Sequence, residues 1–221
     1  ADENGFRQDV LDLVKELGVT CVRYPGGNFV SNYNWEDGIG PRENRPVRRD
    51  LAWHCTETNE MGIDDFYRWS QKAGTEIMLA VNMGTRGLKA ALDELEYVNG
   101  APGTAWADQR VANGIEEPMD IKMWCIGNEV PDQWNGDRGP KLSRFLQDIC
   151  HREDPTRPVT QGMDAPDAVV NNNMAAVMDV AGFNYRPHKY RTNYKKLPQQ
   201  IILGSETAST VSSRGVYKLP V

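Results

Sequence analysis

The sequence has little of what metal-binding, nucleic-acid-binding and membrane proteins need. Its three histidines are scattered and its four cysteines show no CxxC spacing, so no metal motif is visible. A net charge of −6 argues against a nucleic-acid partner, which requires a basic face. No run approaches the ~20 apolar residues of a membrane span, and no glycine-rich phosphate or dinucleotide loop is present. We therefore expect no metal, cofactor, nucleic-acid or membrane partner.

The chain is long enough to bury a substantial core as one domain, since it has 221 residues. No signal peptide is visible, although the chain begins at Ala1, and this favours a cytoplasmic or an engineered recombinant protein. Cys21 and Cys125 fall inside predicted strands, so we expect them to be free and buried thiols.

One stretch, Lys122 to Glu129, is central to the sequence. Its apolar residues 123–126 indicate a buried strand, and Gly127, Asn128 and Glu129 follow directly. In parallel α/β folds, the residues just past the carboxyl ends of strands point into the ligand site. Glu129 is therefore a candidate site carboxylate; the alternative is a surface glutamate at the start of a loop.

A second stretch, 200–207, repeats this arrangement with an aliphatic run, a glycine and then Glu206. Two carboxylates at strand ends can face each other, one as an acid and one as a nucleophile or base. This pair predicts a glycosidase, and in a retaining enzyme the two carboxyl groups lie about 5–5.5 Å apart.

Helical and strand patterns alternate along the chain. Helices are predicted over 5–17, 64–73, 88–98, 142–149 and 165–178. Strands are predicted over 19–24, 76–82, 123–126, 159–163, 180–185 and 201–204. Such alternation favours a parallel sheet, and polar residues follow nearly every strand. A barrel uses all its strand ends whereas a doubly wound sheet uses one switch point, so we predict a (β/α)8 TIM-barrel type.

The segment 29–61 has no clean periodicity and is rich in Asn, Asp, Gly, Pro, Arg and Trp. An irregular segment of this length in an enzyme suggests a binding loop. Trp35 and Trp53 are candidates for stacking on a sugar, with buried loop anchors as the alternative.

Several motifs in the first part of the chain, from about 5 to 129, resemble glycoside hydrolase family 51, the α-L-arabinofuranosidases. They are RYPGGNFV at 23–30, YNWEDG at 33–38, DLAWH at 50–54, MLAVNMGTRG at 78–87 and WCIGNE at 124–129. Later motifs resemble family 2, the β-galactosidase family. These are VPDQWN at 130–135, DPTRPV at 154–159, AGFNY at 181–185 and GSETAS at 204–209. Such a switch near 129–133 is typical of an engineered chimera, with a natural mosaic as the alternative.

The resemblance implies roles for individual residues. Glu129 resembles the acid/base, Glu206 the nucleophile, and Tyr185 the tyrosine that hydrogen-bonds the nucleophile. Asn128 resembles the amide that holds the sugar 2-hydroxyl. Arg23 resembles the family 51 arginine near the nucleophile. Core roles are the alternatives for two of them, an ion pair for Arg23 and ordinary packing for Tyr185.

Asn28, Asn82 and Trp35 are further substrate-binding candidates. In both families the fold is a retaining (β/α)8 barrel, so the six predicted strands correspond to strands two to seven. The resemblance thus implies a single barrel domain over 1–221, complete or incomplete, that a second copy or a companion chain could complete.

Three functions follow from the resemblance. The first is a retaining glycosidase acting on terminal α-L-arabinofuranosides, and the second a β-galactosidase-type enzyme. The third is a chimeric barrel segment with little activity by itself. In each enzymatic case the partner is a carbohydrate substrate.

Overall fold

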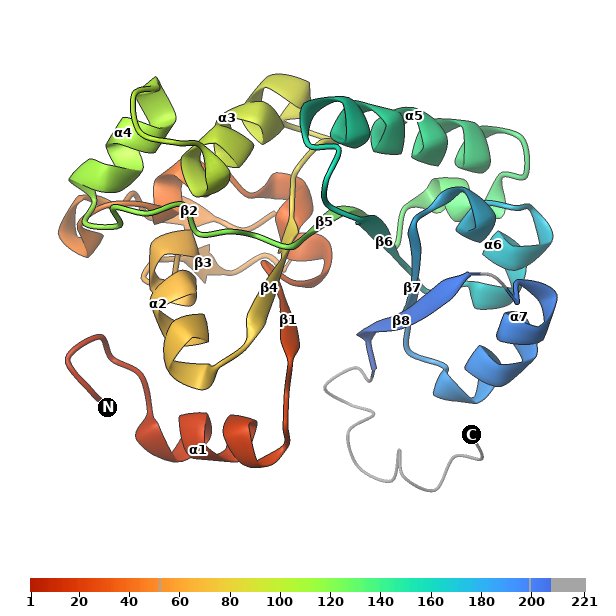
Figure 1. The fold of residues 1–221 in the computed structure, drawn as a ribbon, viewed down its shortest axis with the longest axis horizontal. Helices are drawn as coiled ribbons and strands as arrows, with labels where there is room; N and C mark the ends of the chain where they lie inside the picture. The colour runs from red at the N-terminus through yellow and green to blue at the C-terminus, as the bar shows by residue number, and fades with distance from the viewer. Residues whose placement is uncertain (52, 199, 208–221) are drawn as a thin grey trace. The chain divides into compact units, whose positions relative to one another are not determined.

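A computed structural model describes residues 1–51, 53–198 and 200–207 (Figure 1). The chain divides into two compact units, Ala1–Lys122 and Met123–Val221, which are described separately below as the first and the second unit. The boundary between the units lies directly before the strand predicted over 123–126. Three motif residues, Ala52, Ala208 and Ser209, lie outside the described residues. A single barrel domain with a family switch near 129–133 stays a prediction.

The first unit contains two parallel strands and the helices that follow the predicted pattern. Arg23 on one strand lies opposite Met78 on the other. The strands are β1 (Cys21–Tyr24) and β4 (Glu76–Ala80), and the helices are α1 (Gln8–Glu16), α2 (Ile63–Ala73), α3 (Gly87–Asn99) and α4 (Ala105–Ala112). Helix α1 packs on α2 through a small cluster of Phe6, Leu11 and Ala73.

The segment 29–61, which shows no periodicity in the sequence, folds into short elements. They are the 3-10 turns η1 (Gly27–Asn32), η2 (Trp35–Gly38) and η3 (Arg42–Asn44) and the antiparallel strands β2 (Arg48–Arg49) and β3 (Thr56–Glu57). Asp65 of α2 holds this segment through ion pairs with Arg42 at 2.8 Å and with buried Arg45 at 2.6 Å. Because both guanidinium groups bind one carboxylate, that carboxyl group has a lowered pKa despite its burial.

The second unit contains four parallel strands in sequence order, each paired with the next. The strands are β5 (Met123–Asn128), β6 (Val159–Met163), β7 (Val180–Asn184) and β8 (Ile201–Glu206). The connections are η4 (Pro131–Trp134), α5 (Arg138–Glu153), α6 (Pro166–Asn171), η5 (Ala175–Val177), η6 (Pro187–Lys189) and α7 (Tyr190–Lys196).

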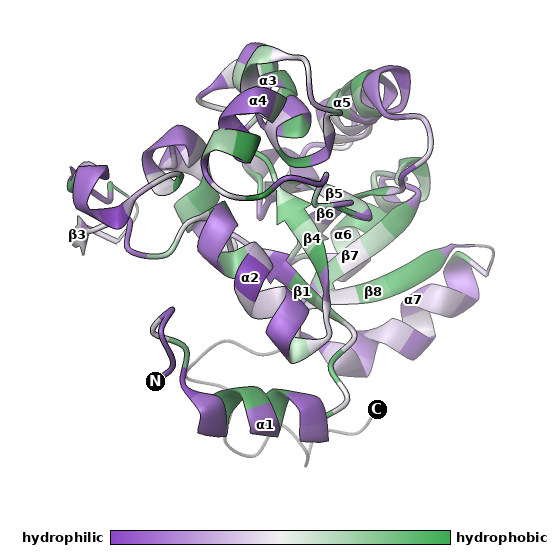
Figure 2. Ribbon diagram, turned by 60° about the vertical axis from the view of Figure 1, so that its left-hand side comes forward, coloured by the Kyte–Doolittle hydropathy of each residue, from purple (hydrophilic) through white to green (hydrophobic). Residues whose placement is uncertain are grey.

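The core of the second unit lies between its sheet and the connecting helices. Met163 and Phe183 from the strands pack with Val169 and Met174, all fully buried. Figure 2 shows the hydrophobic colouring of the strands and the mixed colouring of the helices. Burial of apolar side chains from both layers is the main stabilising contribution to such a layer pair.

The structure corrects the extent of several predicted elements. The helix predicted over 165–178 ends at Asn171, because Asn173 adopts a left-handed backbone (φ 65°) and a 3-10 turn follows. Helix α5 is longer than predicted, and α4 forms two turns. Cys21 is exposed rather than buried, whereas Cys125 is buried as expected. None of the four cysteines, all within the described residues, forms a disulfide.

All six predicted strands are present, and the α/β prediction of a partial (β/α)8-barrel type is confirmed. Within the described part of the chain, no helix combines the length and the apolar character needed to cross a membrane.

Candidate active site

The two candidate glutamates lie at the carboxyl ends of strands in the second unit. Glu129 directly follows Asn128, the last residue of β5, and Glu206 is itself the last residue of β8. The apolar runs predict strands ending near Ile126 and Gly204. The structure extends both strands by two residues, so the polar residues belong to the sheet edge.

Each of these strands is irregular just before its glutamate. In the β5–β6 pair, Cys125 lies opposite Thr160 and Asn128 opposite Gly162, so β5 has one more residue than β6 over this step. In the β7–β8 pair, Phe183 lies opposite Gly204 but Asn184 opposite Glu206, so Ser205 is the extra residue of a bulge. Bulges change the direction of side chains and occur next to active sites.

The backbone leaves the strands in an uncommon conformation. Glu129 (φ 46°), Tyr185 (φ 56°) and Arg186 (φ 49°) are left-handed without being glycine. Hydrogen bonds hold two of them: the Glu129 amide donates to the Gly162 carbonyl at 2.8 Å, and the Tyr185 amide donates to the Glu206 carbonyl. Such strained positions cost roughly 1–3 kcal/mol each and cluster at functional sites.

Tyr185 contacts both glutamates. Its hydroxyl donates to Oε2 of Glu206 at 2.6 Å. The pKa of Tyr185 is raised above its ordinary value, chiefly by burial and then by hydrogen bonding to Glu206 and to Glu129. A phenolate beside two carboxylates would be unfavourable, so the hydroxyl remains a donor. The structure therefore brings Glu129, Tyr185 and Glu206 together.

Asn184, the last residue of β7, is hydrogen-bonded to three residues of this site. Its Nδ2 donates to Oδ1 of Asn128 at 2.9 Å and to Oε1 of Glu129 at 3.1 Å. Its Oδ1 accepts from the Ser205 hydroxyl at 2.7 Å. Asn184 and Ser205 are not among the site residues predicted from the sequence. Their position could have indicated a role in the site, because each directly precedes a predicted site residue.

The remaining candidates lie in the first unit. Arg23 is a half-buried residue of β1, and Asn28 is an exposed residue of η1. Asn82 is buried after β4, where its Nδ2 donates to the Tyr33 carbonyl at 3.2 Å and to Thr85 Oγ1 at 2.8 Å. Its Oδ1 accepts from the Thr85 amide at 3.1 Å, so Asn82 organises its own loop. Substrate contacts by these three residues stay predictions.

Trp35 is buried, with 4% of its surface exposed. Its indole donates to the Ala90 carbonyl at 3.1 Å and packs against the rings of Tyr97 and Trp106. Trp35 is therefore a loop anchor, the second of the two sequence interpretations, because no ring face is left open to stack on a sugar. Trp53 is 64% exposed.

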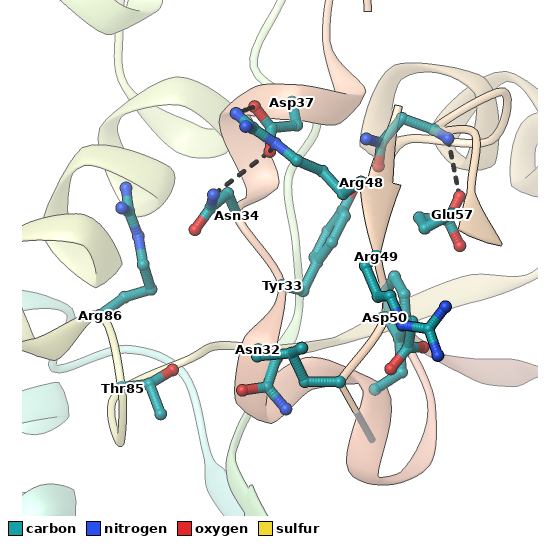
Figure 3. A pocket seen from close by; sticks show the side chains of 13 residues that line it. Asn32, Tyr33, Asn34, Asp37, Arg48, Arg49, Asp50, Glu57, Thr85 and Arg86 are labelled. Atoms are coloured by element: carbon teal, nitrogen blue, oxygen red, sulfur yellow. Dashed lines mark hydrogen bonds and ion pairs between the residues drawn. The ribbon is translucent and has the colours of Figure 1, made fainter. Parts of the chain in front are cut away.

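A polar pocket of about 320 Å³ lies in the first unit, lined mainly by the segment 29–61 (Figure 3). Arg48 binds Asp37 through two hydrogen bonds of 2.8 and 3.0 Å, which lowers the pKa of that carboxyl group. Asn34 donates to the same carboxylate at 3.2 Å. The lining thus combines amides with charged side chains, and the Phe29 and Tyr33 rings are in contact.

The model of the "Alpha-L-arabinofuranosidase 1 domain" matches residues 13–201. The intracellular exo-α-(1→5)-L-arabinofuranosidase of Bifidobacterium longum is 96% identical over 134 residues, which are 61% of this chain and 24% of that protein. The Bacillus subtilis enzyme of the same description (enzyme 1) is 57% identical over 134 residues, 61% of this chain and 27% of that protein. The matches thus span about a quarter of these relatives.

Solved structures agree with this assignment. A family 51 α-L-arabinofuranosidase from Bifidobacterium longum matches with a TM-score of 0.73 at 64% identity, over 87% of this chain and 41% of that one. The Thermotoga maritima α-L-arabinofuranosidase matches with a TM-score of 0.74 at 39% identity, over 84% and 40%. A family 2 glycosyl hydrolase from Bacteroides cellulosilyticus, 21% identical with a TM-score of 0.51 over 89% and 21%, shares the fold alone. The chain belongs to glycoside hydrolase family 51, the α-L-arabinofuranosidases.

Proposed function

We propose that this chain carries the catalytic pair of a retaining exo-α-L-arabinofuranosidase, with Glu206 as nucleophile and Glu129 as acid/base. One observation supports this most directly: both carboxylates interact with the single hydroxyl of Tyr185. Two carboxylates that interact with one hydroxyl lie close together, which suits the close pair of a retaining enzyme better than the wider inverting pair.

In the first step, a Glu206 oxygen forms a bond to the anomeric carbon while the bond to the leaving oxygen breaks. Glu129 gives its proton to that oxygen, so the aglycone departs as a neutral alcohol. In the second step, Glu129 takes a proton from water, and the water oxygen displaces Glu206. Two inversions restore the original anomeric configuration.

The Tyr185 hydroxyl orients the Glu206 carboxylate in the free enzyme. Its hydrogen bond to Oε2 occupies one carboxylate oxygen. The other oxygen can then attack, and the same hydroxyl can bind the oxygen left behind in the covalent intermediate. Asn128, hydrogen-bonded to Asn184, is placed beside Glu129, where its amide would contact the sugar 2-hydroxyl.

A terminal α-L-arabinofuranoside is the proposed substrate because relatives that are 96% and 60% identical over the matched residues are named exo-α-(1→5)- and exo-α-(1→6)-L-arabinofuranosidases. The pocket of the segment 29–61 is lined by polar and charged side chains that can hydrogen-bond the hydroxyl groups of a sugar. The names of several relatives also favour an intracellular location for the proposed activity.

The alternatives have narrower support. The family 2 resemblance of 130–221 favours a β-galactosidase-type activity, and its structural neighbour shares only the fold. A chimera is supported by the extent of the 96% match: it covers 134 of 221 residues, leaving 221 − 134 = 87 outside it. A segment without its own turnover is the third alternative.

The test is hydrolysis of 4-nitrophenyl α-L-arabinofuranoside and 4-nitrophenyl β-D-galactoside by the purified chain. We expect release from the arabinofuranoside, with the product formed in the retained configuration by NMR. Glu206→Gln should abolish it, and Glu129→Gln should lower turnover by about 10²–10⁴-fold. Exposed Glu153→Gln is the matched control in the same unit. Inverted product, or unchanged rates in both site variants, would refute the proposal.

A further inference from the structure

We propose that Asn184 and Ser205 are positioning residues that hold the side chain of Glu129 for proton transfer. This inference rests on the proposed function. The Ser205 hydroxyl donates to Asn184 Oδ1 at 2.7 Å, and Asn184 Nδ2 donates to Glu129 Oε1 at 3.1 Å. The chain of bonds links the ends of β8, β7 and β5, so three strands fix one carboxylate.

The orientation of the Asn184 amide follows from its neighbours. On one side lie two oxygens, Oδ1 of Asn128 and Oε1 of Glu129. Rotating the amide by half a turn would place its carbonyl oxygen against both of them, at the cost of two hydrogen bonds. Asn184 is fully buried, so water cannot replace these bonds. Ser205 supports the same orientation by donating to the opposite end.

Glu129 needs such support because its side chain can rotate about its own bonds. A glutamate side chain has three rotatable bonds, and ordering it costs up to about 1.5–2 kcal/mol. The hydrogen bond from Asn184 reduces this cost. It also stabilises the negative charge that Glu129 carries after giving up its proton.

The bulge in β8 explains how Glu206 reaches the site beside Ser205. In a regular pairing the residue after Gly204 would lie opposite Asn184, but Glu206 takes that position and Ser205 is extra. This extra residue allows two consecutive side chains to act at one site. The Ser205 hydroxyl goes to Asn184, and the Glu206 carboxylate goes to Tyr185.

The test compares two leaving groups. A 4-nitrophenol departs with little help from an acid, whereas an alkyl alcohol needs full protonation, as in methyl α-L-arabinofuranoside. We expect Asn184→Ala to lower kcat/KM about 10²-fold on the methyl glycoside and less than about 10-fold on the aryl glycoside. Ser205→Ala should change the ratio in the same direction by about 3- to 10-fold.

A buried serine that makes the same kind of bond elsewhere in the unit is the matched control. Ser143 donates to the side-chain oxygen of Gln161 at 3.0 Å, so Ser143→Ala should lower stability without changing the substrate ratio. Ser205→Thr keeps the hydroxyl and should restore the ratio. Asn184→Asp, which keeps the shape, replaces Asn184→Ala if that variant does not fold.

Equal losses of kcat/KM on both substrates for Asn184→Asp and Ser205→Ala would overturn the positioning role. The proposed function would then remain intact, provided that Glu206→Gln is inactive on both substrates. Activity retained by Glu206→Gln, or a parent chain inactive on both substrates, would overturn the proposed function and this inference together.

Discussion

At the scale of single residues, the site depends on one phenol placed between two carboxylates. Tyr185 is held in a left-handed conformation, and its hydroxyl donates to Glu206 at 2.6 Å. The sequence places a tyrosine next to a strand end but contains no signal for this backbone geometry. Because burial and both glutamates raise the pKa of Tyr185, the hydroxyl stays protonated across the range in which glycosidases act.

Tyr185→Phe removes this donor and keeps the ring. We expect kcat on the aryl arabinofuranoside to fall roughly 10- to 100-fold, the equivalent of one charge-assisted hydrogen bond. A raised phenol pKa means that Tyr185 does not ionise near neutrality. Rate profiles from pH 5 to 9 should therefore show the same alkaline limb for parent and variant. An alkaline limb that disappears in the variant would contradict this assignment.

At the scale of elements, the sheet of the second unit needs glycine where strands approach closely. A Cβ atom on Gly182 of β7 would lie 2.4 Å from the Gln161 carbonyl oxygen and 3.0 Å from Ser205 Oγ. The first of these is a backbone atom of the neighbouring strand, so it cannot move alone. The glycine also keeps the bulge that carries Ser205 close to β7.

Gly182→Ala should therefore destabilise the protein by about 1–3 kcal/mol, the usual cost of overpacking a core. Urea unfolding followed by circular dichroism measures this. The control is Gly84→Ala, because a Cβ there meets no atom within 4 Å and its backbone is not left-handed. Equal midpoints for the two variants would show that the sheet adapts to the added methyl group.

At the scale of the whole molecule, the family is defined by a match over 13–201, which runs through both compact units.

Stability also belongs to this scale, because every buried ionisable group contributes to it. Glu94 on α3 is only 4% exposed, and burial, with the charge of Glu36, raises the pKa of its carboxyl group well above the usual value.

Because the pKa of Glu94 is raised in the folded state, this state keeps a proton that the unfolded chain releases above its own glutamate pKa near 4.5. This contribution to stability is complete below pH 4.5 and is lost as pH rises toward the folded value, by up to about 1.4 kcal/mol per pH unit. Glu94→Gln should remove this dependence. Its advantage over the parent in urea midpoint should thus grow from pH 5 to 8.

The control for this prediction is Glu43→Gln, an exposed glutamate of the same unit, which should unfold in parallel with the parent at every pH. A Glu94→Gln variant that is less stable than the parent by a constant amount would show that the carboxyl group is instead held by favourable contacts.

The order of the elements and the chemistry at the strand ends follow from the amino-acid pattern alone. Apolar runs locate most of the six strands, since a strand buried on both faces is largely apolar. Glu129 and Glu206 stand out because a carboxylate directly after such a run is delivered to the sheet edge. Family motifs added the roles of Tyr185 and Asn128, and the structure brings these four residues together.

How these residues are held depends on the packing and pairing of distant segments. The two irregular steps before Glu129 and Glu206 arise from pairing between strands that lie far apart in sequence, so no local pattern predicts them. Burial of Trp35 against Tyr97 and Trp106, and the exposure of Cys21 on β1, likewise depend on which surfaces meet. Asn184 and Ser205 gain a function for the same reason, because hydrogen bonds across strands are set by register and not by sequence spacing.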